Sequence, residues 1–364
     1  MRRLALVAAL LVPFPAIAFS INSGFSNGCH ERLTVLAYQR ALLDLPLNNL
    51  VPPEDDTWRE FAIFLAEQIG GSTQLASSDV SDADQFLILS LVVGVRAPDT
   101  DGHSILNLTN LRELHSDPSP EGQYAHALRG PDDDEAAGDA TAVEGTRARI
   151  IDLLDEATRL LQLPDSEQII MGTAYLDFYG RFEMTVHGPT YYLGQAMHAL
   201  QDSFSHSIRD EAGGYRQVVH VMNYVEAISG EIVERRDGLA HSDSMDDCDG
   251  EPGEVGGTVD AAVDASADLL LTFRTIALSR DRDAVTRFLD KWVTLKEDCT
   301  FDNAFCGNDR WLAVTRIAQT EPYLESIFSC SAGRGSSGKG AVFVLMFLAV
   351  GLLAAARMTP NTTR

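Results

Sequence analysis

The sequence has few basic residues, and this shortage excludes most nucleic-acid-binding proteins. Its 28 lysines and arginines are outnumbered by 53 aspartates and glutamates, which gives a formal net charge of −25. Such a surface repels a nucleic-acid backbone or an anionic membrane over most of its area. The sequence also lacks a basic and aromatic track of the kind that holds a single nucleic-acid strand. Nucleic acid is therefore not favoured as a partner, whereas a local cationic site made by bound metal ions remains compatible with the charge.

The N-terminal segment is typical of a signal peptide. Arg2 and Arg3 precede an apolar stretch, and Ala16-Ile17-Ala18 is an A-x-A cleavage site. The stretch is short for a first membrane helix and ends in a cleavage signal, which disfavours that alternative. We therefore expect residues 1–18 to be removed, an exported protein, and a mature chain that begins at Phe19.

The C-terminal segment predicts anchoring or processing. Cys330 stands at the start of a Gly/Ser-rich spacer, 329–340, which is followed by an apolar helix, 341–357, with a basic end. The apolar run is short for a free-standing transmembrane helix, which needs about twenty residues. The arrangement resembles bacterial C-terminal sorting tails of the GlyGly-CTERM and MYXO-CTERM kind. That resemblance implies cleavage near Cys330 by sorting machinery, followed by surface display or release. A plain membrane anchor is the alternative, and both place the protein at the cell surface, in the outer membrane or outside the cell.

The remaining cysteines favour disulfides over a thiolate metal site. Cys29, Cys248, Cys299 and Cys306 are even in number, would lie in an oxidising compartment, and form no C-x-x-C pair. We expect two disulfides. Cys299 and Cys306 could close a small loop and leave Cys29 to pair with Cys248, but three pairings are possible.

Residues 19–328 have almost only helical periodicity. No alternating strand pattern, Asn-Gly hairpin or long repeat stands out. Apolar residues recur at three- and four-residue spacing in 30–45, 58–69, 148–163, 165–182, 191–206, 215–229, 259–278, 283–295 and 309–328. The continuous apolar run 86–95 follows an N-cap signal at Ser81-Asp82, so we expect a fully buried helix there. The sequence predicts one all-α domain, a multi-helix bundle with long loops at 97–140 and 236–258.

One of these segments carries a metal-ligand pattern. His198, Asp202 and His206 are spaced four and four residues apart, so they share one face of a helix. Two imidazoles and a carboxylate are ligand types that suit zinc. A core helix whose polar residues pair with one another is the alternative. Three ligand-type residues on one face favour metal binding.

The pattern G-x-x-x-H-x-x-x-D-x-x-x-H from Gly194 to His206 resembles the zinc-dependent phospholipase C family, whose fold is shared with the S1/P1 nucleases. The second gap is slightly shorter than in the best-known members, and the resemblance covers roughly 19–226. It implies an all-α domain that binds two or three Zn²⁺ ions. Family members bind one zinc through the amino group and carbonyl of the mature N-terminal residue, which is Phe19 here, and His30 resembles the histidine that shares that ion.

The resemblance implies further ligands in the loop after 95 and beyond the central helix. Asp99 ends a segment, Gly94 to Asp99, that resembles one ending in a zinc-binding aspartate. His126 resembles the next family histidine, with His115 as a competitor whose spacing from Asp99 is closer to the family's. His220 resembles the histidine of a later helix. Asn223 is its possible oxygen-donating neighbour, because the family's glutamate position is a tyrosine here.

This ligand set implies a hydrolase in which zinc ions activate water for attack on a phosphodiester. Asp202 would bridge two ions, and Asp99 would bind one and orient or deprotonate the water. Gln201 and Ser205 would fix imidazole tautomers. The expected substrate is a phospholipid, cleaved on the diacylglycerol side. The alternatives are a nuclease or other phosphodiesterase on the same fold, and a non-catalytic surface protein with a structural zinc site.

Overall fold

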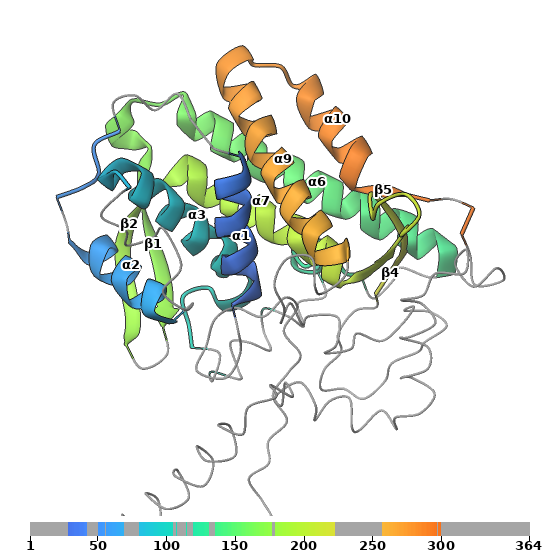
Figure 1. Cartoon of the computed structure of the whole chain (residues 1–364), viewed down its shortest axis with the longest axis horizontal. Helices are drawn as coiled ribbons and strands as arrows, with labels where there is room; N and C mark the ends of the chain where they lie inside the picture. The colour runs from blue at the N-terminus through green and yellow to red at the C-terminus, as the bar shows by residue number, and fades with distance from the viewer. Residues whose placement is uncertain are drawn as a thin grey trace, which may run out of the picture. The chain divides into compact units, whose positions relative to one another are not determined.

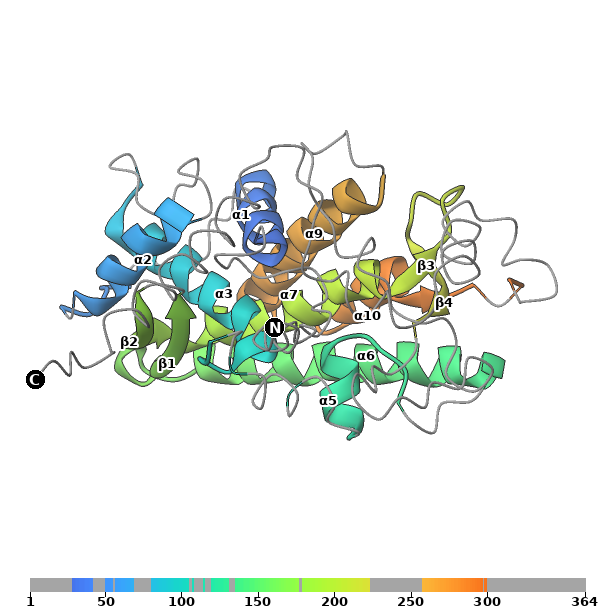
Figure 2. The same cartoon turned by 90° about the horizontal axis from the view of Figure 1, so that it is seen from below.

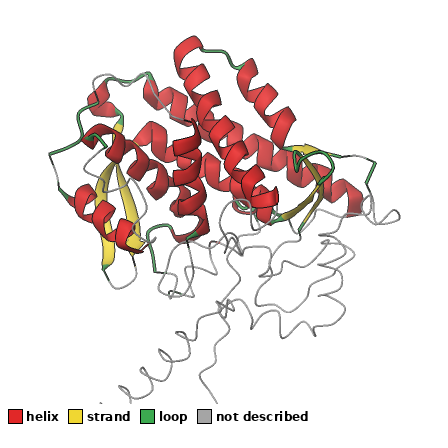
Figure 3. Ribbon diagram, in the orientation of Figure 1, coloured by secondary structure: helices red, strands yellow, loops and turns green. Residues whose placement is uncertain are grey.

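A computed structural model of the chain describes residues 28–41, 50–54, 56–68, 80–104, 107, 114, 119–130, 135–176, 179–222, 257–296 and 298–299. All of them belong to one unit of the chain, Met1–Ser331. Helices dominate this described part, and two small sheets accompany them (Figure 3). The expected signal peptide, the C-terminal tail and the helix at 309–328 lie outside the described residues.

The described helices are α1 Cys29–Ala41, α2 Thr57–Gln68, α3 Asp82–Thr100, α5 Pro120–Ala125, α6 Glu135–Leu161, α7 Gly188–Ser205, α9 Gly257–Ser279 and α10 Asp283–Trp292, with the 3-10 turn η2 Asp165–Glu167. The strands are β1 Ile169–Leu176, β2 Gly180–His187, β3 Ser207–Arg209, β4 Gln217–Val221 and β5 Thr294–Leu295. The helices expected at 30–45, 58–69, 191–206, 259–278 and 283–295 correspond to α1, α2, α7, α9 and α10.

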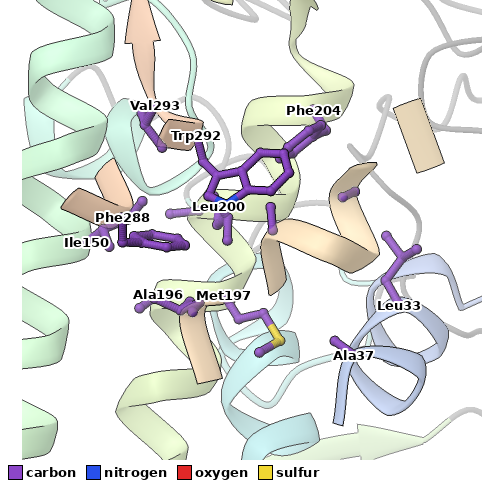
Figure 4. Packing of buried hydrophobic residues seen from close by; sticks show 14 of the residues in the cluster. Leu33, Ala37, Ile150, Ala196, Met197, Leu200, Phe204, Phe288, Trp292 and Val293 are labelled. Carbon is purple, nitrogen blue, oxygen red and sulfur yellow. The ribbon is translucent and has the colours of Figure 1, made fainter. Parts of the chain in front are cut away.

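Helix α7 lies in the middle of the helices, packed against α3, α6 and α9 (Figures 1 and 2). Its apolar side chains Leu193, Met197, Leu200 and Phe204 are fully buried. Figure 4 shows Met197, Leu200 and Phe204 among residues of α1 and α10. Burial of a side chain of this size stabilises the fold by about 1.5–3 kcal/mol. The helix that carries the predicted ligands is therefore held on several sides.

Helix α3 is the wall shared by two apolar clusters. Leu91 and Val95 belong to the cluster around α7, α9 and α10. Ile88 and Val92 belong to a second cluster with α2 and the β1–β2 hairpin. A helix with core on both sides is apolar all round, which explains the continuous run in the sequence. The expected buried helix is confirmed, and the Ser81 hydroxyl accepts the N–H of Asp84 (3.1 Å) as its N-cap.

Two segments expected to be helical are strands, so the all-α prediction holds only as a helix-rich fold. Most of 165–182 forms β1 and the start of β2, an antiparallel hairpin in which Ile169 faces His187 and Leu176 faces Gly180. In 215–229, the described residues form β4, which is antiparallel to β3 and parallel to β5. Strand hydrogen bonds join residues of two different segments, which the spacing within one segment does not reveal. The three- and four-residue spacing of apolar side chains therefore predicted helices where the structure has strands.

The expected long loop at 97–140 is also partly wrong. Helix α3 continues to Thr100 with Pro98 inside its last turn, and Asp101 ends it in the left-handed region (φ 44°) with its N–H on the carbonyl of Ala97. Residues 120–125 form α5, and α6 begins at Glu135. The acidic residues at the start of α6 concealed a helix with one buried face.

Candidate metal centre

Two glycines let α3 and α7 cross closely enough to bring their polar residues together. A Cβ added at Gly94 would lie 2.0 Å from the carbonyl oxygen of Tyr191, and one at Gly194 would lie 2.2 Å from that of Leu91. No larger side chain fits without moving the backbone. The close crossing places Asp99, in the last turn of α3, beside His198 in the middle of α7, with Oδ1 and Nε2 3.6 Å apart.

Three donor atoms converge at the middle of α7. His198 Nε2 lies 3.0 Å from Asp202 Oδ2 and 3.2 Å from His126 Nδ1. His126 Nδ1 in turn lies 3.1 Å from Asp202 Oδ2. His126 comes from the turn after α5, so the three atoms belong to two segments of the chain. They form one of two groups in the described residues whose donor atoms could hold a metal ion.

The second group overlaps the first. It consists of His30, Asp99 and His198. His30, in the first turn of α1, points Nε2 at Asp202 Oδ1 (3.1 Å) and lies 3.9 Å from Asp99 Oδ2. Asp99 Oδ1 lies 3.7 Å from His126 Nδ1. The two oxygens of Asp202 therefore face different histidines, and both aspartates reach toward both groups.

Hydrogen bonds fix the orientation of the imidazole rings. His30 Nδ1 donates to Gln201 Oε1 (2.7 Å), and the Gln201 amide donates to Thr34 (3.2 Å) and Ser266 (3.3 Å). His198 Nδ1 donates to the carbonyl of Val95 (2.9 Å). Both rings therefore present Nε2 to the centre, a common arrangement for metal-binding histidines. The role expected for Gln201 is present, whereas the Ser205 hydroxyl donates to the carbonyl of Asp202 rather than to a ring.

The charges explain why a cation fits among these atoms. Burial lowers the pKa of His198 to about 4, so its ring is neutral at pH 7. Its Nδ1 carries the proton, since a carbonyl can only accept. The lone pair of Nε2 therefore faces a carboxylate oxygen 3.0 Å away, and Asp202 stays ionised because neighbouring imidazoles hold its pKa well below the usual range in spite of burial. Lone pairs at this distance repel each other, and a metal ion between them would turn the repulsion into coordination.

The pKa values of His30 and Asp99 are both raised in the metal-free protein. Burial opposes the charged form of His30, but the charge of Asp202 outweighs it and raises the pKa of His30 to about 9. Burial raises the pKa of Asp99 well above its usual range. At pH 7 His30 is therefore cationic and must release a proton when it binds a metal, and Asp99 holds its proton more tightly than an ordinary carboxyl group does.

His206 and His220 lie beside this centre on paired segments. His206 is the C-cap of α7, and its Nδ1 donates to the carbonyl of His126. The N–H of Met222 donates to the carbonyl of His206 (2.8 Å), and Ile208 pairs with His220. His220 lies on strand β4 and not on a helix, so a helical spacing of three residues does not link it to Asn223.

The sequence interpretation missed Asp139, which is 5% exposed. Its carboxylate accepts Nδ1–H of His220 (3.0 Å) and the N–H of Val221 (2.7 Å), and it pairs with Arg129 (2.7 Å). The loop expected at 97–140 includes Asp139, in a run of acidic residues that would be solvated. The signal was present, because Asp139, Ala142 and Val143 begin a buried stripe at helical spacing on α6.

The structure brings five predicted ligands into the two donor groups: His30, Asp99, His126, His198 and Asp202. Phe19, His115, Asn223, Cys248, Cys306 and Cys330 lie outside the described residues. Cys29 and Cys299 are buried, and their disulfide pairing stays a prediction. His187, outside both groups, is buried and donates from Nε2 to Gln168 (3.2 Å).

Comparisons with protein-family models, with curated proteins and with solved structures find no match to this chain. Within the described part of the chain, none of the helices has the length and apolar character needed to cross a membrane. The buried histidines and aspartates are therefore the features of the molecule that bear on its function.

Proposed function

We propose that the protein is a zinc-dependent hydrolase of phosphodiester bonds, with phospholipid as its expected substrate. The observation that carries the proposal is the pair of overlapping donor groups, one of His126, His198 and Asp202 and the other of His30, Asp99 and His198. The groups share His198, whose Nε2 can bind one ion, whereas the two oxygens of Asp202 face His30 on one side and His126 and His198 on the other. Asp202 would therefore be shared between two ions held side by side, an arrangement that many phosphodiester hydrolases use. The resemblance of Gly194 to His206 to the phospholipase C helix supports the same reading.

The donor set suits zinc better than magnesium or calcium. Three imidazole nitrogens and two carboxylates contribute, whereas the harder cations prefer oxygen ligands alone. In a tetrahedral zinc site with bonds of about 2.0–2.1 Å, ligand atoms lie about 3.3 Å apart. The edges of the triangle between His126 Nδ1, His198 Nε2 and Asp202 Oδ2 measure 3.0–3.2 Å. The triangle therefore matches one face of such a tetrahedron.

When bound, zinc lowers the pKa of water and neutralises charge on a phosphate. The chain supplies the rest. Asp202 directs one oxygen to His30 and the other to His126 and His198, which suits a carboxylate that joins two metal positions. Asp99 faces both groups from the other helix. Its carboxylate would orient the attacking water and accept its proton.

A second candidate is a surface protein whose metal site is purely structural. The observation that favours it is burial, since the side chains of the five donor residues are only 0–3% exposed. Structural zinc sites are closed, whereas catalytic sites keep a position open for water or substrate. The two candidates make different predictions for substrate turnover by the metal-loaded protein.

The deciding experiment combines metal analysis with a diester assay. Purified full-length protein is tested for nitrophenol release from nitrophenyl phosphorylcholine and from bis-nitrophenyl phosphate, before and after chelation and after zinc is restored. We expect hydrolysis that is lost on chelation and returns with zinc. His187→Asn is a matched control, because His187 is a buried histidine outside both donor groups. Two or more bound zinc ions without hydrolysis of any diester would leave the structural candidate.

A further inference from the structure

A buried ion pair connects the two helices that carry His30 and Asp99. Glu31 in α1 accepts a hydrogen bond from Nη1 of Arg96 in α3, and both side chains are almost completely buried. Arg96 also donates from Nη2 to the carbonyl of Tyr175 in β1 (2.8 Å). One guanidinium thus links α1, α3 and the hairpin.

Each member of the pair adjoins a metal donor. Glu31 directly follows His30, and Arg96 precedes Asp99 by three residues, about one helical turn. Val95, the neighbour of Arg96, holds the ring of His198 through its carbonyl. The ion pair therefore joins the two helices that carry His30 and Asp99 of the second donor group.

Net stabilisation does not account for a pair in this position. Removing two charges from water costs about as much as their attraction returns, so apolar replacements of similar size are often neutral or stabilising. A charged pair adds a directional contact, because the guanidinium group of arginine donates hydrogen bonds to its partners in one fixed geometry. Helix α1 packs against both α9 and α3, and the ion pair adds a directional contact to its packing on α3.

A metal site needs ligands that are held at fixed distances from one another. Ligand distances must hold to within about 0.2 Å, and His30 Nε2 and Asp99 Oδ2 already lie 3.9 Å apart. We propose that the Glu31–Arg96 ion pair is a positioning device that sets the distance between His30 and Asp99 and so controls occupancy of the second metal position. This inference rests on the metal-binding part of the proposed function. The first position, held by His126, His198 and Asp202, does not involve α1.

The test separates metal affinity from folding. Full-length Glu31→Leu/Arg96→Met protein, with charges replaced by apolar side chains of similar size, is compared with wild type by chelator competition and by urea unfolding of the metal-free form. We expect unchanged or higher metal-free stability, a 10- to 100-fold loss of affinity for one zinc ion, and retention of the other. Arg147→Met/Asp290→Leu is the control, since that interhelical pair (2.8 Å) joins α6 to α10, neither of which supplies a donor to either group.

Single variants keep the proposal testable if the double variant does not fold. Arg96→Lys retains the charge but not the forked guanidinium group, and Glu31→Gln retains the shape but not the charge. Each variant should lower the affinity for one zinc ion in a folded protein. Full zinc affinity in the folded variants would overturn the proposal, as would a loss of affinity matched by equal loss of metal-free stability. A wild-type protein that binds no zinc would overturn it too. Wild-type protein that binds zinc without hydrolysing a diester refutes only the enzymatic proposal, since the readout here is zinc affinity.

Discussion

Asp202 Oδ1 lies 3.1 Å from His30 Nε2, and this contact joins α7 to α1 across the centre of the molecule. Both side chains are fully buried. The other oxygen of Asp202 contacts His126 and His198, so one carboxylate touches three imidazoles. A carboxylate in this position neutralises the charge that His30 carries in the metal-free protein and contacts histidines of both donor groups.

Replacing Asp202 with alanine should remove most of the bound zinc, because one donor group loses its only carboxylate and His30, in the other group, loses the carboxylate oxygen 3.1 Å from its Nε2. Loss of a residue that only hydrogen-bonds to a metal ligand lowers metal affinity about 10- to 100-fold. Because Asp202 would be a ligand itself, we expect a drop of at least about 100-fold. Metal analysis of the protein after gel filtration measures the effect. Zinc content equal to that of wild type would refute the metal centre.

Zinc affinity should rise with pH. The pKa of His30 is raised to about 9 by Asp202 against the effect of burial, so below that pH a zinc ion must displace its proton. A displaced proton makes the zinc affinity fall about tenfold for each unit by which the pH is lowered. Chelator competition between pH 6 and 8 measures this slope. Affinity that does not change over that range would contradict the assignment of His30 as a ligand.

Gly94→Ala should destabilise the protein strongly, since the new methyl group would lie 2.0 Å from the backbone oxygen of Tyr191. Overpacking of this kind costs about 1–3 kcal/mol and sometimes more. It would also separate Asp99 from His198. Gly172→Ala is the comparison, because there the nearest atoms to the methyl group would be side-chain atoms of Val186 at 3.0 Å. Urea unfolding should give a clearly larger loss for Gly94→Ala, and equal losses would contradict the close helix crossing.

The buried His187 should make the fold sensitive to acid. Burial lowers its pKa to about 4, while the unfolded chain has an ordinary value near 6.5. Below pH 6.5 the unfolded state binds a proton that the folded state does not, so stability falls between pH 6.5 and about 4, by at most about 3 kcal/mol. His187→Asn should flatten this part of the pH profile relative to wild type in urea unfolding at pH 7.5 and 4.5. Parallel profiles for the two proteins would refute the assignment.

Asp139→Asn should destabilise the protein, because it removes a buried charge that pairs with Arg129 and accepts hydrogen bonds from His220 and Val221. Breaking a buried pair in this way costs about 3–5 kcal/mol. Asp152→Asn, on the exposed face of the same helix, is the control and should change the free energy of unfolding by less than about 0.5 kcal/mol. Equal effects of the two substitutions would show that Asp139 has no special role.

The sequence by itself determined the features that depend on neighbours along the chain. The i, i+4 spacing of His198 and Asp202 and the N-cap of α3 at Ser81 are local, because helical hydrogen bonds join residues four apart. The helix-rich character of the fold follows from the same local periodicity. The resemblance to a family added His30, Asp99 and His126 as ligands, and the structure brings them together with His198.

Only the tertiary structure decided the rest. The hairpin at 169–187 depends on pairing between two segments, which a periodic pattern within one segment cannot reveal. Asp139 becomes buried because Arg129 and His220 satisfy its charge, and neither is its neighbour on α6. The Glu31–Arg96 pair exists only because α1 packs beside α3. Burial and charge pairing arise between distant parts of a chain, and for that reason the three-dimensional fold had to supply them.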